Sequence, residues 1–321
     1  MGNLDKPFLT YEKQIRKLKE EKKLTIPDDE FAIDLLKKHS YFDLISGYKG
    51  MFKKKNGDYK LHVSIEDIYQ LYCFDDNLRA LFLKYILKVE KHIKSLISYA
   101  FCEKHGESQM EYLSVINYNY TEAYMEGINK LVWKLAGIIN KPENYTYIVH
   151  QRNRHGNIPL WVMMKALTLG TVSKMYSFMT HDIQSKISKE FEGVDESTLV
   201  RMLDLLSRVR NVCAHNERLY DYRYNKGTID DMELHKRLGL PCKNGHYEKG
   251  KKDLFAVVIC FNYLLDEKDF VSFGEELEHE IRILCAKTNK IQRTQLYKKM
   301  GFPLNWMDIN SKIGDVVSMI Q

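Results

Sequence analysis

A fixed cation, a carboxamide and a titratable imidazole lie close together in this 321-residue chain, at Arg210, Asn211 and His215. The guanidinium is charged at every physiological pH, and an imidazole can give or take a proton near neutrality. Such a set could grip a phosphodiester and move a proton beside it. That is the chemistry of RNA cleavage without a metal.

Whether these side chains face solvent depends on the orientation of the helix expected over residues 196–219. At about 100° per residue, His215 points roughly 200° away from Cys213. Asn211 and His215 are spaced i, i+4 and therefore share one face, turned away from the core. The core side is marked by one apolar stripe with helical spacing, formed by Leu199, Met202, Leu206, Val209 and Cys213.

Further arginines flank this face and leave two interpretations open. On a continuous helix, Arg208 and Arg218 extend the stripe of Asn211 and His215, while Arg210 lies on its flank. Either Arg208 or Arg210 could be the phosphate-binding cation, since spacing alone does not choose between them. The alternative interpretation is structural: basic side chains on a polar ridge near the C-terminus of a helix interact favourably with the helix dipole.

The composition indicates a soluble, mostly helical protein. Apolar residues make up 44% and charged residues 29%, prolines number only six, and no apolar run reaches the roughly 20 residues of a membrane span. The start of the chain, Met1 to Lys6, matches neither a signal peptide nor a myristoylation site, so we expect a cytoplasmic protein.

Six scattered cysteines without a C-x-x-C pair predict free thiols, no zinc site and no cofactor. The net charge of +6 is compatible with a polyanionic partner. Lysines concentrate in residues 13–23, 49–60 and 287–299; each segment is either a solvated face or, for the first two, a surface suited to a structured RNA.

Helical periodicity predicts where the elements lie. Ser64 should cap a long helix that runs, with one break, to about residue 104, and Asn56-Gly57 suggests a short hairpin within residues 49–64. A later helix should begin near Pro159 and break at Gly170-Thr171. Further helices are expected over residues 8–23, 121–139, 182–191, 253–266 and 270–287.

Four side-chain assignments follow from the same periodicity. Asp75 with Arg79, and Glu90 with Lys94, are i, i+4 pairs that favour structural salt bridges, although Glu90 could also support the site. We assign Tyr48 and Trp161 to the core as aromatics rather than to RNA stacking.

The string from Arg210 to His215 resembles the R-x(4–6)-H signature of HEPN-domain ribonucleases. More narrowly, the chain resembles the Abi-like (AbiD/AbiF) abortive-infection family of bacterial phage defence. The segments that carry this resemblance occur in the family's order, over about residues 10–225: Ser40 to Tyr48, Phe74 to Arg79, Val89-Glu90, Pro159 to Trp161, Leu169 to Thr171 and Val209 to Asp221.

The resemblance implies an all-α, HEPN-like helical bundle. It would comprise an N-terminal helical and aromatic region with a basic loop (residues 1–63), a core carrying R-x4-H (64–266) and a C-terminal helical extension (267–321). It also implies a metal-independent endoribonuclease that cleaves RNA at a cleft between two R-x(4–6)-H helices. Because this chain has one such helix, a homodimer would complete the site.

The resemblance implies that His215 acts as general acid or base and that Arg210 holds the scissile phosphate. Asn211 would orient the imidazole or bond the phosphate. The substrate's own 2′-OH would be the nucleophile. Weaker candidates for positioning RNA by charge and stacking are Arg208, Arg218, Tyr220 and Tyr222.

Two other functions compete with the nuclease. The chain could be a non-catalytic HEPN module that binds RNA or a protein through the same basic surface. It could also be a helical regulator or antitoxin whose ridge serves only dimerisation. A toxic nuclease would further need restraint by a regulatory non-coding RNA, an antitoxin protein or a conformational latch.

Overall fold

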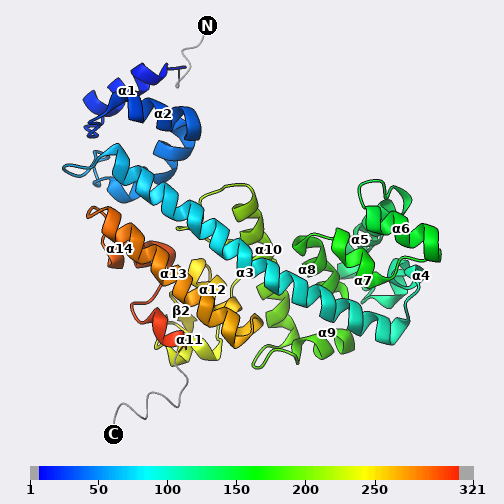
Figure 1. The fold of residues 1–321 in the computed structure, drawn as a ribbon. Coiled ribbons are helices and arrows are strands. Elements are labelled where there is room, and N and C mark those ends of the chain that lie inside the picture. Colours follow the sequence, from blue (N-terminus) through cyan, green and yellow to red (C-terminus); the bar gives the residue numbers. More distant parts are fainter. Residues whose placement is uncertain (1–6, 311–321) are drawn as a thin grey trace.

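The computed structural model describes residues 7–310 and confirms an all-α architecture (Figure 1). The chain start at Met1 to Lys6 and the end of the expected extension, residues 311–321, lie outside the described residues. The α-helices are α1 Tyr11–Glu20, α2 Asp29–His39, α3 Ile65–His105, α4 Gln109–Leu113, α5 Glu122–Asn140, α6 Thr146–His155, α7 Leu160–Met163, α8 Leu169–Phe178, α9 His181–Ser188, α10 Glu196–Ala214, α11 Glu233–Arg237, α12 Leu254–Leu264, α13 Glu267–Lys287 and α14 Arg293–Met300.

Shorter elements join these helices. A π-helical turn covers Phe42–Ser46 (η1), and 3-10 turns cover Lys49–Phe52 (η2), Val115–Asn117 (η3), Met164–Ala166 (η4) and Trp306–Asn310 (η5). The strands β1 Cys242–Lys243 and β2 His246–Tyr247 form a small antiparallel ribbon.

The 41-residue helix α3 is the axis of the molecule. Ser64 opens it as predicted, with a capping box in which the Ser64 hydroxyl accepts the Asp67 N–H and the Asp67 carboxylate accepts the Ser64 N–H. The predicted break is wrong, because the buried apolar positions continue without interruption through Ile86, Ile93 and Ile97. The helix is therefore about 60 Å long.

Helix α13 runs antiparallel along the first half of α3, as the orange and cyan helices in Figure 1 show. The Thr288 hydroxyl, just after α13, donates to Asp67 at 2.5 Å, and Lys88 pairs with Asp269 at the opposite end, also at 2.5 Å. These contacts bring the end of α13 to the start of α3, so they fix both the direction and the register of the pair.

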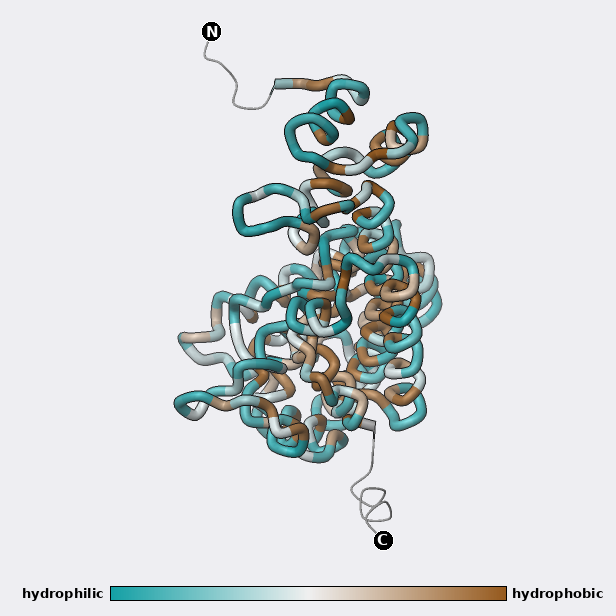
Figure 2. The backbone as a smooth tube through the Cα atoms, turned by 90° about the vertical axis from the view of Figure 1, so that its left-hand side faces the viewer, coloured by the Kyte–Doolittle hydropathy of each residue, from teal (hydrophilic) through white to brown (hydrophobic). Residues whose placement is uncertain are grey.

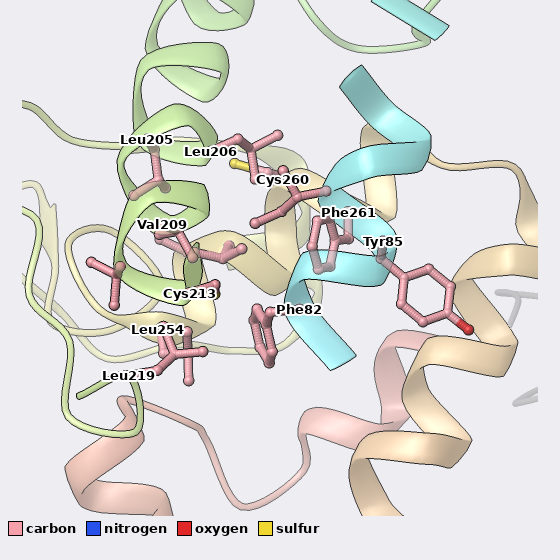
Figure 3. Close-up of a cluster of buried hydrophobic side chains, with 14 of the residues drawn as sticks. Phe82, Tyr85, Leu205, Leu206, Val209, Cys213, Leu219, Leu254, Cys260 and Phe261 are labelled. Carbon is pink, nitrogen blue, oxygen red and sulfur yellow. The ribbon is translucent and has the colours of Figure 1, made fainter. Parts of the chain in front are cut away.

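The main core lies where α3, α10, α12 and α13 meet (Figure 3). Helix α12 is apolar on all sides and buried on all sides, as expected for a helix enclosed by others. Figure 2 shows the same pattern along the chain, with hydrophobic residues on the inward sides of the helices. Phe82 of α3 meets Phe261 of α12 and Phe273 of α13, with ring centroids 5.7 and 5.2 Å apart.

Helices α4 to α9 surround the second half of α3 (Figure 1). Lys104 near the end of α3 pairs with Asp182 of α9 at 2.8 Å. The predicted break in this helical stretch is present but lies at Leu167-Thr168, where both residues are extended, rather than at Gly170-Thr171. Thr168 caps α8 by accepting the Thr171 N–H, so Gly170 and Thr171 lie in its first turn. Across the described residues, no helix combines the length and apolar character needed to cross a bilayer.

The turn expected at Asn56-Gly57 is present, and its flanks pair as a very short antiparallel hairpin. Lys53 and Tyr59 form one bridge, and the Lys54 and Lys60 N–H groups donate to the Asp58 and Phe52 carbonyls, each at 2.8 Å. Tyr48 is buried as predicted, at 3% exposure, whereas Trp161 is 50% exposed and is not a core aromatic. The domain boundaries expected at residues 63 and 266 fall just before α3 and α13, and they stay predictions.

Candidate functional site

Helix α10 ends at Ala214, earlier than the predicted residue 219, so His215 is its C-cap. Asn216 follows with φ of 55°, a left-handed conformation that asparagine tolerates. The Glu217 N–H donates to the Val212 carbonyl at 3.0 Å and the Asn216 N–H to the Cys213 carbonyl at 3.4 Å, which is the Schellman motif. An asparagine at this position is the helix-stop signal that the periodicity argument missed.

The predicted facing of the helix is confirmed. Cys213 is 6% exposed and packs with the core (Figure 3), whereas Asn211 and His215 are exposed. The His215 N–H donates to the Asn211 carbonyl at 2.9 Å, so these two residues occupy successive turns at the end of α10. The stripe of five apolar residues expected to face the core is buried throughout.

The structure separates the two candidate arginines. Arg208 grips Asp204 with two nitrogens, at 2.9 and 3.2 Å, and that carboxylate also accepts the Tyr224 hydroxyl at 2.6 Å. Arg210 is half-buried, its Nε is buried without a hydrogen-bond acceptor, and no carboxylate of the described residues pairs with it. Arg210 therefore keeps its charge available for an anion, while that of Arg208 is neutralised.

The remaining candidates lie beyond the helix. The prediction that Arg218 extends the helical stripe is wrong, since the helix has already ended; its Nε donates to Asp221 at 2.6 Å and its Nη1 to the Gly47 carbonyl. Tyr220 is 1% exposed, so its ring is closed to stacking on RNA in this conformation. Tyr222 is half-buried, and burial raises the pKa of its hydroxyl.

A buried carboxylate, Asp75 of α3, holds the segment that follows His215. Asp75 is fully buried and accepts four groups: the Tyr48 hydroxyl at 2.7 Å, Arg79 Nη1 at 2.9 Å, the Leu219 N–H at 3.0 Å and the Tyr220 N–H at 2.6 Å. Burial raises the pKa of Asp75, against the opposing effect of these partners. The salt bridge to Arg79 confirms the predicted structural pair.

This network joins three segments that are far apart in the sequence. Tyr48 comes from the aromatic stretch near the start, Asp75 from the first third of α3, and Leu219 from the loop after α10. Burial and the Asp75 carboxylate raise the pKa of Tyr48, so its hydroxyl stays protonated and donates. The end of α10 is thus fixed by the Schellman motif on one side and by Asp75 on the other.

Cys213, two residues before His215, is held as a protonated thiol and is a poor nucleophile. Burial raises the pKa of its thiol to about 12, although Arg79 and Arg210 both act to lower it. The expected free thiols are all present, with Cys213 and Cys260 buried and Cys242 exposed. Residues 7–310 hold no cluster of three or more His, Cys, Asp or Glu side chains arranged to take a metal ion.

Comparisons with known proteins agree with the sequence resemblance. A family model described as Abi-like protein matches residues 34–221. This range contains α3, α10, the Asp75 network and the ridge of Arg210, Asn211 and His215. No curated protein and no solved structure matches the chain.

Proposed function

Since the chain belongs to the Abi-like family, we propose that it is a metal-independent endoribonuclease of an abortive-infection system. The observation that carries the proposal is the contrast between the two arginines. Arg210 lies half-buried without an anionic partner among the described residues, about one and a half turns before the exposed His215, while the neighbouring Arg208 is neutralised by Asp204. A half-buried, unpaired cation beside a free imidazole suits a bound phosphate.

In the proposed reaction, the 2′-oxygen of the substrate attacks the adjacent phosphorus. His215 of one protomer takes the 2′-hydroxyl proton as the new O–P bond forms, and His215 of the other protomer gives a proton to the departing 5′-oxygen. Arg210 stabilises the charge on the phosphate oxygens, and Asn211 orients the imidazole or bonds the phosphate. The products carry a 2′,3′-cyclic phosphate and a 5′-hydroxyl.

A homodimer is part of this proposal. One chain offers one such ridge, and His215 at the end of α10 is open to solvent rather than enclosed by its own chain. Two copies related by a two-fold axis would place two imidazoles across one cleft. RNA is then the substrate, and a regulatory RNA or an antitoxin protein restrains the activity in uninfected cells.

The test is single-turnover cleavage of a labelled RNA by the wild type and three variants. We expect His215→Ala and Arg210→Ala to lose at least about 100-fold in rate, because each removes a group that acts in the transition state. The matched control is Arg208→Ala, two residues from Arg210, which should stay within a few-fold of the wild type. Equal rates for all four proteins would reject the assignment.

Light scattering on the same samples separates loss of chemistry from loss of assembly. Variants that stay dimeric but cannot cut support the catalytic roles. Binding of RNA without cleavage by any of the proteins, wild type included, would instead favour the non-catalytic binding module.

A further inference from the structure

A cleft of about 430 Å³ lies between the second half of α3 and the α7–η4 turn, away from the ridge residues. Figure 1 shows α7 beside this part of α3. Its walls combine apolar, basic and acidic side chains, among them Leu87, Glu90, Lys91, Trp161, Met164 and Lys165. The proposed cleavage chemistry uses none of them.

Trp161 gives the cleft an open aromatic surface. Its neighbours Leu160 and Met163 are buried and anchor α7, yet the Trp161 side chain is 50% exposed, and Leu87 across the cleft is 47% exposed. The fold therefore leaves half of Trp161 uncovered. An exposed indole in a hollow is a platform on which a flat ring can stack.

Two lysines add positive charge at the same place. Lys91 and Lys165 are exposed, and no carboxylate of the described residues pairs with either. Both lysines line the cleft, and the Lys165 ammonium also lies 5.4 Å from the centre of the Tyr147 ring. Such charges attract a phosphate group.

Glu90 supplies an acceptor that the protein leaves unused. The residue is only 8% exposed, and its Oε1 accepts the Lys94 ammonium at 2.6 Å. Its Oε2 is buried without any hydrogen-bond donor. Buried polar atoms in folded proteins nearly always have partners, so this oxygen points to a donor that a ligand would bring.

We propose that the cleft binds one nucleotide of an RNA chain. The base stacks on Trp161 and donates an N–H to the Glu90 carboxylate, whose buried Oε2 turns toward the cleft on binding, while a phosphate lies at Lys91 and Lys165. Glu90 follows Asp75 by 15 residues of α3, about 22 Å. A few nucleotides of single-stranded RNA span that distance, so this inference, which rests on the proposed function, makes the cleft an accessory subsite.

The experiment measures binding of a labelled single-stranded RNA by fluorescence anisotropy, with His215→Ala as the background so that the RNA stays intact. Trp161→Ala should weaken binding about tenfold, the effect of losing one stacked base. The matched control is Trp133→Ala on α5, whose indole is 80% exposed and lies beside Glu126 and Lys130. That control should stay within about twofold. Trp161→Phe, which keeps a stacking ring, should recover most of the affinity.

Two further measurements identify the ligand. In the Lys91→Gln/Lys165→Gln double variant, the salt dependence of RNA affinity should become shallower, by up to about one unit of slope for each phosphate that no longer binds a lysine. A Trp133→Phe background leaves two tryptophans, the exposed Trp161 and the buried Trp306. Titration of AMP, GMP, CMP and UMP should quench their fluorescence only weakly, because a free nucleotide lacks the rest of the chain.

Equal RNA affinity for Trp161→Ala and Trp133→Ala would overturn the proposal. The proposal would also be overturned if a mononucleotide bound tightly while Trp161→Ala left the RNA affinity unchanged. The cleft would then be a site for a free nucleotide. The proposed nuclease fails on a different result: wild-type protein that binds RNA through Trp161 but never cuts it.

Discussion

Helix α3 carries two acid–base pairs with the same i, i+4 spacing, and the two carboxylates differ in how many donors they accept. At Asp75–Arg79 the carboxylate accepts four donors from three separate segments. At Glu90–Lys94 one oxygen is paired and the other has no donor. The first carboxylate joins the start of the chain and the loop after α10 to α3, whereas the second keeps one oxygen without a donor among the described residues.

The largest expected effect comes from removing the charge of Asp75. Asp75→Asn should lower the free energy of unfolding by about 3–5 kcal/mol, because it leaves the buried Arg79 with only the exposed Asp76 as a countercharge and turns an amide toward two N–H donors. Urea unfolding of the purified protein measures the loss.

The neighbouring carboxylate is the matched control for this change. Asp76 also binds Arg79, at 2.9 Å, but its side chain is 61% exposed. Asp76→Asn should therefore cost less than about 1 kcal/mol. If the two substitutions cost the same, burial is not what distinguishes Asp75.

A smaller effect is expected from Tyr48→Phe, which removes only the hydroxyl that donates to Asp75. The loss should be about 1.5–3 kcal/mol, the usual contribution of a hydrogen bond to a charged group. Amide exchange of Leu219 and Tyr220 should become faster, because their N–H groups bond to the same carboxylate. Tyr41→Phe serves as the control, and faster exchange in both variants would mean that the effect is not specific to the network.

The smallest effect on stability is expected at the second pair. Glu90→Gln keeps an oxygen for Lys94, and the replaced oxygen makes no hydrogen bond, so the cost should be about 1 kcal/mol or less. The same urea titration compares it directly with Asp75→Asn. A loss as large as that of Asp75→Asn would show that both pairs are structural anchors.

The sequence was informative wherever periodicity controls the structure. The buried stripe on α10, the Ser64 cap and both acid–base pairs of α3 were predicted from spacing and are present. Spacing could not show that the two pairs differ, because the Leu219 and Tyr220 N–H groups that satisfy Asp75 come from a loop 144 and 145 residues away.

Three features could not be predicted from helical periodicity: the end of α10, the exposure of Trp161 and the choice between the two arginines. The end of α10 was placed too late because the left-handed Asn216 was not recognised as a helix stop. Residue type alone places the aromatic Trp161 in the core, yet α7 is only one turn long and Trp161 lines the cleft. The choice between Arg208 and Arg210 needed the position of Asp204 in space.

The central claim is that the end of α10 cuts RNA through the substrate's 2′-hydroxyl. Mass spectrometry of the fragments made by the dimeric wild type, with a metal chelator present, tests it most directly. The predicted fragments end in a 2′,3′-cyclic phosphate and begin with a 5′-hydroxyl, and one 2′-deoxynucleotide at the cut site abolishes that cut. Fragments with 5′-phosphate ends, or cleavage that stops in the chelator, would contradict it.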